Sequence, residues 1–129
     1  MTEQMRAVGI AALTAFAIVG CGHPSVPLPT TLAAAGASAA SVVLSDFKIT
    51  PPALTMSGPM VRITVRNDGA LSHDLYVGDA SGGVLLRTRT LAPGETETIR
   101  GVLAPGTYTT YCALPGHEDL GMKGTLTVS

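Results

Sequence analysis

The sequence predicts an all-β domain over residues 41–129, a Greek-key β-sandwich or barrel of about eight strands. From Ser41 onward, short apolar and β-branched runs alternate with turn residues at close spacing. No run in this region has the periodicity of an amphipathic helix. Once the N-terminal segment is set aside, the remaining chain has the length of one domain, so we expect a single hydrophobic core.

Each expected strand is bounded by turn residues. The strands are expected at residues 42–44, 47–49, 53–56, 60–66, 75–77, 84–86, 95–102, 107–111 and 124–128. The breaks between them include Pro51-Pro52, Ser57-Gly58-Pro59, Gly82-Gly83, Ala92-Pro93-Gly94 and Ala104-Pro105-Gly106. Within residues 60–66 apolar and polar residues alternate, which places Val61, Ile63 and Val65 on one buried face.

Residues 1–20 are typical of an export signal. Arg6 precedes an apolar run that ends at Val19, and this run is shorter than the roughly 20 residues of a membrane-spanning helix. Ile18-Val19-Gly20-Cys21 resembles a bacterial lipobox, and the resemblance implies lipidation of Cys21 as the first mature residue. The alternatives are an uncleaved anchor and an ordinary signal peptide with an incidental cysteine. We expect an extracytoplasmic protein, in the periplasm or at the cell surface, attached to the membrane through Cys21.

Residues 21–40 are expected to form a flexible linker. They are rich in Pro, Ser, Ala and Thr and carry almost no charge, a composition typical of tethers. The Ala-rich residues 32–40 lack an amphipathic stripe, so disorder is favoured over a short helix. The whole chain has a net charge of −1 and no basic run, which gives no basis for nucleic-acid binding.

The segment from Tyr111 to Met122 carries three metal-binding groups at even spacing. Cys112, His117 and Met122 form the pattern Cys-x4-His-x4-Met. A thiolate and an imidazole suit copper, and a thioether is too weak a donor for zinc or magnesium. Because a blue-copper site uses two His and one Cys in a plane with a distant axial Met, we predict that this loop supplies all but one ligand of a single copper ion, Cu(I)/Cu(II).

The remaining ligand is expected to be His73. The chain has three histidines, and His23 lies in the Pro-rich linker, where no rigid scaffold could orient it. His73 instead follows an expected strand and its terminal Asn67-Asp68-Gly69. A disulfide between the two cysteines is not expected, because Cys21 belongs to the export signal and Cys112 to the ligand loop.

The order of these motifs resembles the cupredoxin family of small blue copper proteins. The resemblance rests on His73 after Asn-x-Gly, Tyr111-Cys112, Pro115-Gly116-His117 and Gly121-Met122. The ligand loop is most similar to the rusticyanin and sulfocyanin branch, and its Cys-x-x-Pro-Gly-His portion is also similar to azurin. The resemblance implies a mononuclear type 1 copper protein that transfers electrons.

Several loop residues are expected to support the metal site. Pro115 restricts the loop and removes an N–H donor that could bond near the sulfur. Gly116 and Gly121 permit tight turns that direct the His117 and Met122 side chains toward one point. Few hydrogen bonds to the thiolate and an apolar surround would both favour Cu(I), and hence a raised reduction potential.

Asp74 and the strand before Cys112 complete the expected site. Asp74 is a candidate acceptor that ties the His73 segment to the Cys112 loop, and the alternative is an ordinary solvated acid. Alternation places Tyr108, Thr110 and Cys112 on one interior face. Tyr108 resembles the tyrosine-corner residue of the family, which implies a structural role.

An apolar surface around His117 is expected to exchange electrons with redox proteins by transient docking. Its residues are Leu71, Ala113, Leu114, Pro115, His117 and Leu120. Glu118 and Asp119 lie beside it in sequence and either set the charge of the partner or form a solvated loop edge. We expect a monomer.

The sequence leaves two functions other than electron transfer open. A copper chaperone or storage protein is the second interpretation, although such proteins tend to use open sites rich in Met or His. A copper-free β-sandwich adhesion module is the third. We do not expect an enzyme, because the chain has too few histidines for nitrite reductase or multicopper oxidase chemistry and has no second cysteine in the loop for a binuclear centre.

Overall fold

The computed structural model describes residues 37–129, and this part of the chain is all-β, as the sequence predicts. The expected signal peptide, Cys21 and the linker up to residue 36 lie outside the described residues. Within residues 37–129, no helix is long and apolar enough to cross a bilayer.

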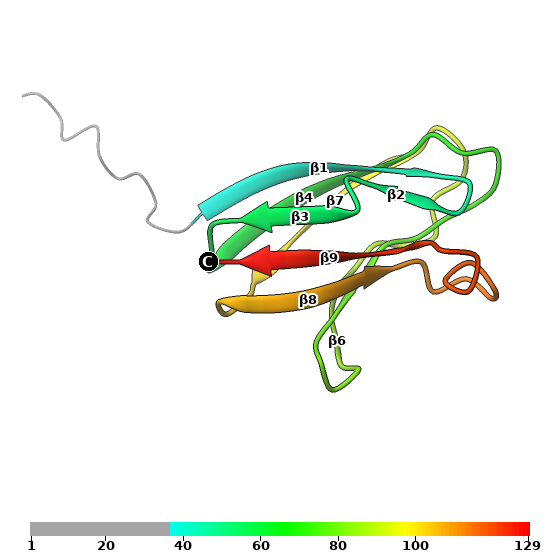
Figure 1. The fold of residues 1–129 in the computed structure, drawn as a ribbon. Helices are drawn as coiled ribbons and strands as arrows, with labels where there is room; N and C mark the ends of the chain where they lie inside the picture. The colour runs from blue at the N-terminus through cyan, green and yellow to red at the C-terminus, as the bar shows by residue number, and fades with distance from the viewer. Residues whose placement is uncertain (1–36) are drawn as a thin grey trace, which may run out of the picture.

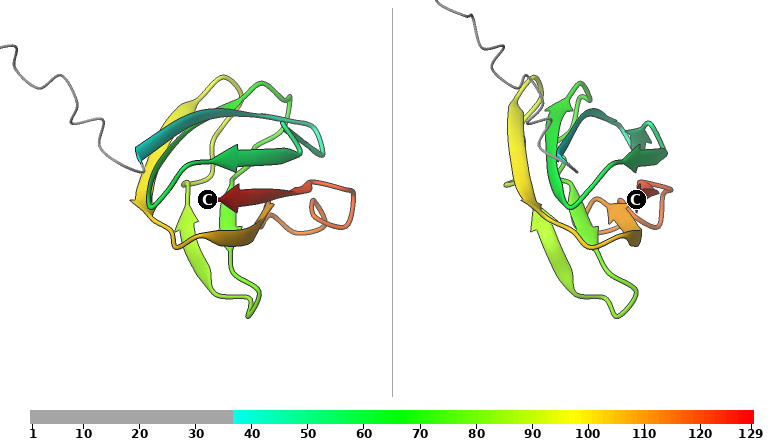
Figure 2. Two further views of the ribbon diagram at one scale, coloured as in Figure 1. Left: turned by 60° about the vertical axis from the view of Figure 1, so that its left-hand side comes forward. Right: turned by 90° about the vertical axis from the view of Figure 1, so that its left-hand side faces the viewer.

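Nine strands form two sheets (Figure 1). They are β1 (Ala37–Ser45), β2 (Lys48–Thr50), β3 (Ala53–Met56), β4 (Met60–Asn67), β5 (Tyr76–Gly78), β6 (Val84–Arg87), β7 (Thr96–Val102), β8 (Gly106–Tyr111) and β9 (Lys123–Val128). One sheet has the order β2-β1-β4-β7 and the other β3-β9-β8-β5-β6. The sheets face each other and curl around a common interior (Figure 2). The sequence predicted about eight strands, and the described chain has nine, among them β1 and β2 as the two strands of a hairpin.

The first strand begins at Ala37, so part of the expected linker belongs to the sheet. β1 runs parallel to β4, from Ala37 opposite Met60 to Leu44 opposite Asn67. This ladder pairs the backbone of residues 37–40, which the sequence assigned to a disordered tether. The Ala-rich composition gives no strand signal, and only the neighbouring strand makes the segment regular.

The core lies between the two sheets. In β4, Val61, Ile63 and Val65 are buried and their neighbours face outward, which confirms the predicted alternation. Large buried side chains from the other elements are Leu44, Met56, Leu75, Leu91, Leu103 and Leu126. Each such side chain contributes about 1.5–3 kcal/mol when fully buried, so this core gives the scaffold its rigidity.

The predicted metal ligands lie in connections at one end of the sandwich, the right-hand end in Figure 1. His73 lies in the connection from β4 to β5, and Cys112, His117 and Met122 lie in the connection from β8 to β9. The turn between β1 and β2 lies at the same end. The start of β1 and the end of β9 lie at the opposite end, so the ligand end is clear of both described termini.

Candidate metal centre

His73 is held by the protein interior. It forms an isolated antiparallel bridge with Leu91, in which the His73 N–H donates to the Leu91 carbonyl at 3.0 Å and the Leu91 N–H donates back at 2.7 Å. The side chain of His73 has 0% exposure. Pairing therefore fixes the backbone of this residue, and packing keeps its imidazole inside the molecule.

Asn67 secures the loop that leads to His73. Its side-chain amide donates to the carbonyls of Leu71 and Leu91, both at 2.8 Å, and its Oδ1 accepts the N–H of Gly69 at 2.9 Å. Asn67 is buried, and these bonds satisfy the polar atoms that burial removes from water. The side chain thus connects the loop to the residue that pairs with His73.

Cys112 directly follows β8, and its thiol lies near the His73 imidazole. Thr110 and Cys112 are buried and Thr109 is exposed, as the predicted alternation requires. Burial, as the largest cause, raises the pKa of the Cys112 thiol above its ordinary value. The thiol is therefore protonated at neutral pH unless a metal ion displaces its proton.

The ligand loop between β8 and β9 is built from tight turns. Gly116 and Gly121 have φ of 80° and 99°, in the left-handed region that strains other residues. Cys112 donates its N–H to the Met122 carbonyl at 3.1 Å, and Met122 donates its N–H to the His117 carbonyl at 3.1 Å. Backbone bonds therefore join all three predicted ligands of this loop.

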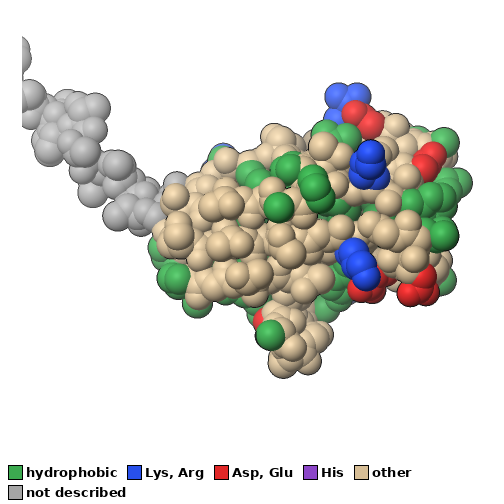
Figure 3. All heavy atoms as spheres, in the orientation of Figure 1, with side chains coloured by type: hydrophobic (Ala, Val, Ile, Leu, Met, Phe, Trp, Pro, Cys, Tyr) green, Lys and Arg blue, Asp and Glu red, His purple; other side chains and the backbone are tan. Residues whose placement is uncertain are grey.

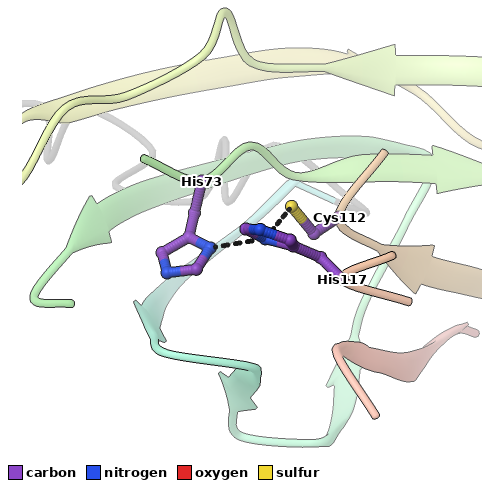
Figure 4. Close-up of side chains that lie close together, drawn as sticks. All are labelled: His73, Cys112 and His117. Carbon is purple, nitrogen blue, oxygen red and sulfur yellow. Dashed lines mark hydrogen bonds between the residues drawn. The ribbon is translucent and has the colours of Figure 1, made fainter. Parts of the chain in front are cut away.

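Three donor atoms converge at this end of the sandwich (Figure 4). The Nδ1 atoms of His73 and His117 lie 3.2 Å apart, and the Cys112 Sγ lies 3.5 Å from His117 Nδ1. The three side chains place their donor atoms within 4.8 Å of one another. One thiolate and two imidazoles are the equatorial ligands of blue-copper sites, and the cluster fits one copper ion.

Met122 is linked to this cluster through its backbone, and its side chain belongs to the hydrophobic core. Its side chain has 0% exposure, and its backbone bonds to Cys112 and His117. A buried thioether is a weak donor that copper accepts as a distant axial ligand. That role for Met122 remains a prediction.

Asp74 joins the two ligand segments. Its Oδ1 accepts the N–H of Ala113 at 2.7 Å, and the residue is buried. The contact is the expected tie rather than that of an ordinary solvated acid. The expectation that Pro115 leaves the sulfur with few hydrogen-bond donors stays a prediction.

Asp46, in the turn between β1 and β2, was missed by the sequence analysis. Its Oδ1 lies 3.2 Å from His73 Nε2 and also accepts the N–H groups of Ala70 at 3.0 Å and Leu71 at 3.2 Å. The His73 hydrogen bond, followed by that of Leu71, lowers the pKa of Asp46. An acid between two short strands predicts a turn, and nothing in the sequence pairs it with a histidine 27 positions away.

Phe47, the other residue of this turn, was missed as well. Its ring meets the His117 imidazole edge-on, with centroids 5.2 Å apart and an interplanar angle of 78°. Phe47 has φ of 58°, a left-handed conformation that is unusual for an aromatic residue. Apolar residues at strand ends are common, so the contact has no sequence signal.

The residues of the apolar surface predicted around His117 differ in exposure, and their role in electron exchange stays a prediction. His117 is half-buried, Leu71 and Leu120 are 46% and 62% exposed, and Ala113 and Pro115 are exposed. Leu114 is half-buried, as His117 is, and packs against the core. Figure 3 shows hydrophobic side chains at the right-hand end of the molecule, among acidic and basic ones.

Tyr108 makes the contact that its resemblance implied. Its hydroxyl donates to the carbonyl of Ala104, four residues upstream. This is the geometry of a tyrosine corner, which pins the start of the strand that carries Cys112.

Comparison with known families decides the assignment. The model of the cupredoxin-like domain matches residues 9–128. The chain belongs to the cupredoxin-like family. No curated protein sequence matches this cupredoxin.

Solved structures similar to this cupredoxin share its fold. Reduced auracyanin from the photosynthetic bacterium Roseiflexus castenholzii has a TM-score of 0.65 and 22% identity, over 70% of this chain and 96% of that chain. An azurin from Methylomonas sp. strain J has a TM-score of 0.61 and 17% identity, over 70% and 97%. A purple cupredoxin from Nitrosopumilus maritimus has a TM-score of 0.56 and 22% identity, over 70% and 99%. The similarity of the ligand loop to rusticyanin and sulfocyanin stays a prediction.

Proposed function

We propose that this protein is a mononuclear type 1 blue copper protein that carries single electrons between extracytoplasmic redox partners. The observation that carries the proposal is the convergence of His73, Cys112 and His117 within 4.8 Å at one end of a β-sandwich. Membership of the cupredoxin-like family supports the same conclusion. When bound, copper supplies a one-electron Cu(I)/Cu(II) couple at this point.

The ligand positions are set by protein contacts alone. His73 is fixed by its bridge to Leu91, and Cys112 by the end of β8 and its backbone bond to Met122. Because the scaffold positions these groups, they keep nearly the same arrangement in both oxidation states of the site. Little rearrangement is then required when an electron moves.

Electrons enter and leave through His117. The side chains of His73 and Cys112 are buried, and His117 is the half-buried member of the cluster. The exposed residues Leu71 and Leu120 provide a small apolar contact of the kind used by transient redox complexes.

Charges of both signs surround this contact. Lys48 and Lys123 line a groove of about 460 Å³ between β2 and the ligand loop, together with Leu120. Glu118 and Asp119 are exposed within the loop. Both groups are placed to influence which partner docks.

The burial of the site favours a carrier over a copper chaperone, and we propose that the protein is not an enzyme. A chaperone must hand its metal to a partner, whereas two of the three clustered ligands here have no exposure. We further propose that the protein is a monomer and that Cys21 anchors it to the membrane. The lipobox resemblance is the support for the anchor.

The visible spectrum of the full chain with Cu(II) tests the proposal. A covalent Cu(II)–thiolate bond gives an intense band, so we expect a blue or blue-green protein that bleaches on reduction. Cys112→Ser removes the soft donor with little change in size and should abolish the band. Cys21→Ser is the matched control and should retain it. A Cys112→Ser protein that kept its colour would show that the ligands are elsewhere.

A competing Cu(I) chelator separates the carrier from the chaperone. A carrier should exchange electrons repeatedly with a small redox reagent while it keeps its copper. Rapid transfer of copper from the reduced wild type to the chelator would favour the delivery protein.

A further inference from the structure

We propose that the turn between β1 and β2, Asp46-Phe47, is a positioning element for both histidines of the metal centre. Asp46 selects the tautomer of His73, and the Phe47 ring restricts the imidazole of His117. The inference rests on the proposed function, but its first test needs no copper.

The contact with Asp46 determines which nitrogen of His73 carries the proton. A neutral imidazole has one N–H and one acceptor nitrogen, and an ionised carboxylate can only accept. Asp46 Oδ1 lies 3.2 Å from His73 Nε2, so Nε2 must carry the hydrogen. His73 Nδ1 is then the nitrogen with a free lone pair, and it is the atom that lies 3.2 Å from His117 Nδ1 in the cluster. Asp46 thus leaves the metal-facing nitrogen available as a donor.

Asp46 is itself held in place. The same Oδ1 accepts the N–H groups of Ala70 and Leu71, which belong to the loop that carries His73. The carboxylate therefore binds the imidazole and its loop together. An aspartate that only completed a turn would bond within that turn, as Asp79 does with Ser81.

Gly69 gives independent support for this contact. A Cβ at position 69 would lie 2.5 Å from Asp46 Oδ1 and 3.0 Å from His73 Nε2. Gly69 is not among the glycines with positive φ, so space rather than backbone conformation requires the glycine. Its missing side chain leaves the room in which Asp46 reaches His73.

Phe47 acts on the other imidazole. Its left-handed φ of 58° is unfavourable for an aromatic residue. Such strain persists where surrounding structure requires it, and it is common around functional sites. The edge-on contact with His117, with ring centroids 5.2 Å apart, provides the compensating interaction. Phe47 therefore restricts the movement of the His117 imidazole, and Asp46 determines the tautomer of the buried His73 imidazole.

The first test is the His73 tautomer in the metal-free full chain, measured from the ring ¹⁵N chemical shifts by NMR. The wild type should show one tautomer, with Nε2 protonated. Asp46→Asn keeps an accepting oxygen and should retain that tautomer, whereas Asp46→Ala should give a mixture. Gly69→Ala should give a mixture too, because its methyl group displaces the carboxylate.

Matched controls exist in the turn between β5 and β6. Asp79→Ala removes a carboxylate that bonds within its own turn, and Gly83→Ala places a methyl 2.9 Å from that carboxylate. Both should leave the His73 tautomer unchanged. A wild type with Nδ1 protonated, or an Asp46→Ala protein with a single Nε2–H tautomer, would overturn the role of Asp46.

Copper affinity is the second readout. Loss of a group that orients a ligand histidine costs about 10–100-fold in metal affinity, so Asp46→Ala and Gly69→Ala should weaken Cu(II) binding by that factor. Asp79→Ala and Gly83→Ala should not. A colourless wild type would refute the proposed function, and the tautomer measurement would still decide the role of Asp46. Unchanged affinity in both site variants would overturn the inference.

The role of Phe47 is tested by the mobility of His117. Phe47→Gly relieves the backbone but removes the ring, so ¹⁵N relaxation should report a more mobile His117 imidazole in a folded protein. Phe47→Leu should do the same in part, and Phe47→Tyr should behave like the wild type. Unchanged imidazole mobility in Phe47→Gly would restrict the positioning role of the turn to Asp46.

Discussion

The segment that carries His73 and the loop that carries His117 hold the same kind of ligand in opposite ways. His73 is buried, pairs with Leu91 and binds the carboxylate of Asp46. His117 is half-buried in a series of turns and touches the Phe47 ring. One imidazole is held by the interior of the sandwich, and the other by a surface loop.

This difference shows how one metal centre can be both rigid and accessible. The buried segment determines which atoms face the cluster, because its backbone pairing and hydrogen bonds cannot change without leaving buried polar groups unpaired. The loop closes the site through backbone bonds and leaves one ligand edge at the surface. A change in the first region should therefore affect stability and ligand identity, and a change in the second should affect access and electron exchange.

Replacing each histidine by glycine should give the largest effect. Both His73→Gly and His117→Gly should lose the blue spectrum, because each removes an equatorial ligand. Added imidazole should restore the colour of His117→Gly at roughly tenfold lower concentration than that of His73→Gly, a difference of about 1.4 kcal/mol. The measurement is an imidazole titration followed in the visible range. Equal rescue of both variants would show that the burial of position 73 does not hinder the entry of imidazole.

Asn67→Ala should cause the largest loss of stability in the His73 segment. It removes three hydrogen bonds and leaves the carbonyls of Leu71 and Leu91 without this donor. We expect the free energy of unfolding of the metal-free protein to fall by about 2–4 kcal/mol, since each lost partner costs about 1 kcal/mol or more. Urea unfolding measures the change. Thr98→Ala, which loses one exposed bond to Thr64, is the control and should cost less than about 1 kcal/mol.

Gly116→Ala and Gly121→Ala should have an intermediate effect on the ligand loop. Both glycines have positive φ, and a Cβ at either would meet no atom within 4 Å, so the cost is conformational. Each change should lower the free energy of unfolding by about 1–2 kcal/mol. Chemical denaturation of the metal-free protein measures it. Loss of copper without loss of stability would mean that the turns matter for the site and not for the fold.

Met122→Leu should change the fold little and the reduction potential clearly. The side chain is buried in the core, and a swap of this kind costs less than about 1.5 kcal/mol. The variant should keep copper and colour, while the potential rises because a weak donor that stabilises Cu(II) is lost. Voltammetry is the measurement. An unaltered potential would place the thioether away from the metal.

Leu120→Asp should have the smallest effect on the folded protein. Leu120 is 62% exposed, so the free energy of unfolding should change by no more than about 0.5 kcal/mol. The spectrum should stay intact, and electron transfer to a docked redox protein should slow because docking would bury a charge. Thr107→Asp, at an exposed position of β8, is the control. Equal rates for Leu120→Asp and the wild type would place the docking surface elsewhere.

Much of the site was visible in the sequence because its ligands are close together along the chain. Cys112, His117 and Met122 occur in one loop, and their donor types indicate copper without any structure. His73 was found by elimination among three histidines. The strands were recognised by alternation and turn residues, since both depend on local chemistry.

The misses share a cause. Residues 37–40 have no strand signal of their own and become regular through pairing with β4. Asp46 and Phe47 likewise have no sequence signal for their contacts with His73 and His117. Each depends on a partner that is distant along the chain, so no window of sequence contains the information.

The sequence by itself determined the all-β class, the metal and three of its expected ligands, because donor chemistry and strand periodicity are properties of neighbouring residues. The tertiary structure alone decided how those ligands are held. It brought Asp46 to His73 and Phe47 to His117, since contacts between different loops form only where the sheets bring those loops to one end. The same packing turns Nδ1 of His73 toward His117 and Nε2 toward Asp46. The sequence therefore predicted the residue, and the fold decided which of its two nitrogen atoms faces the cluster.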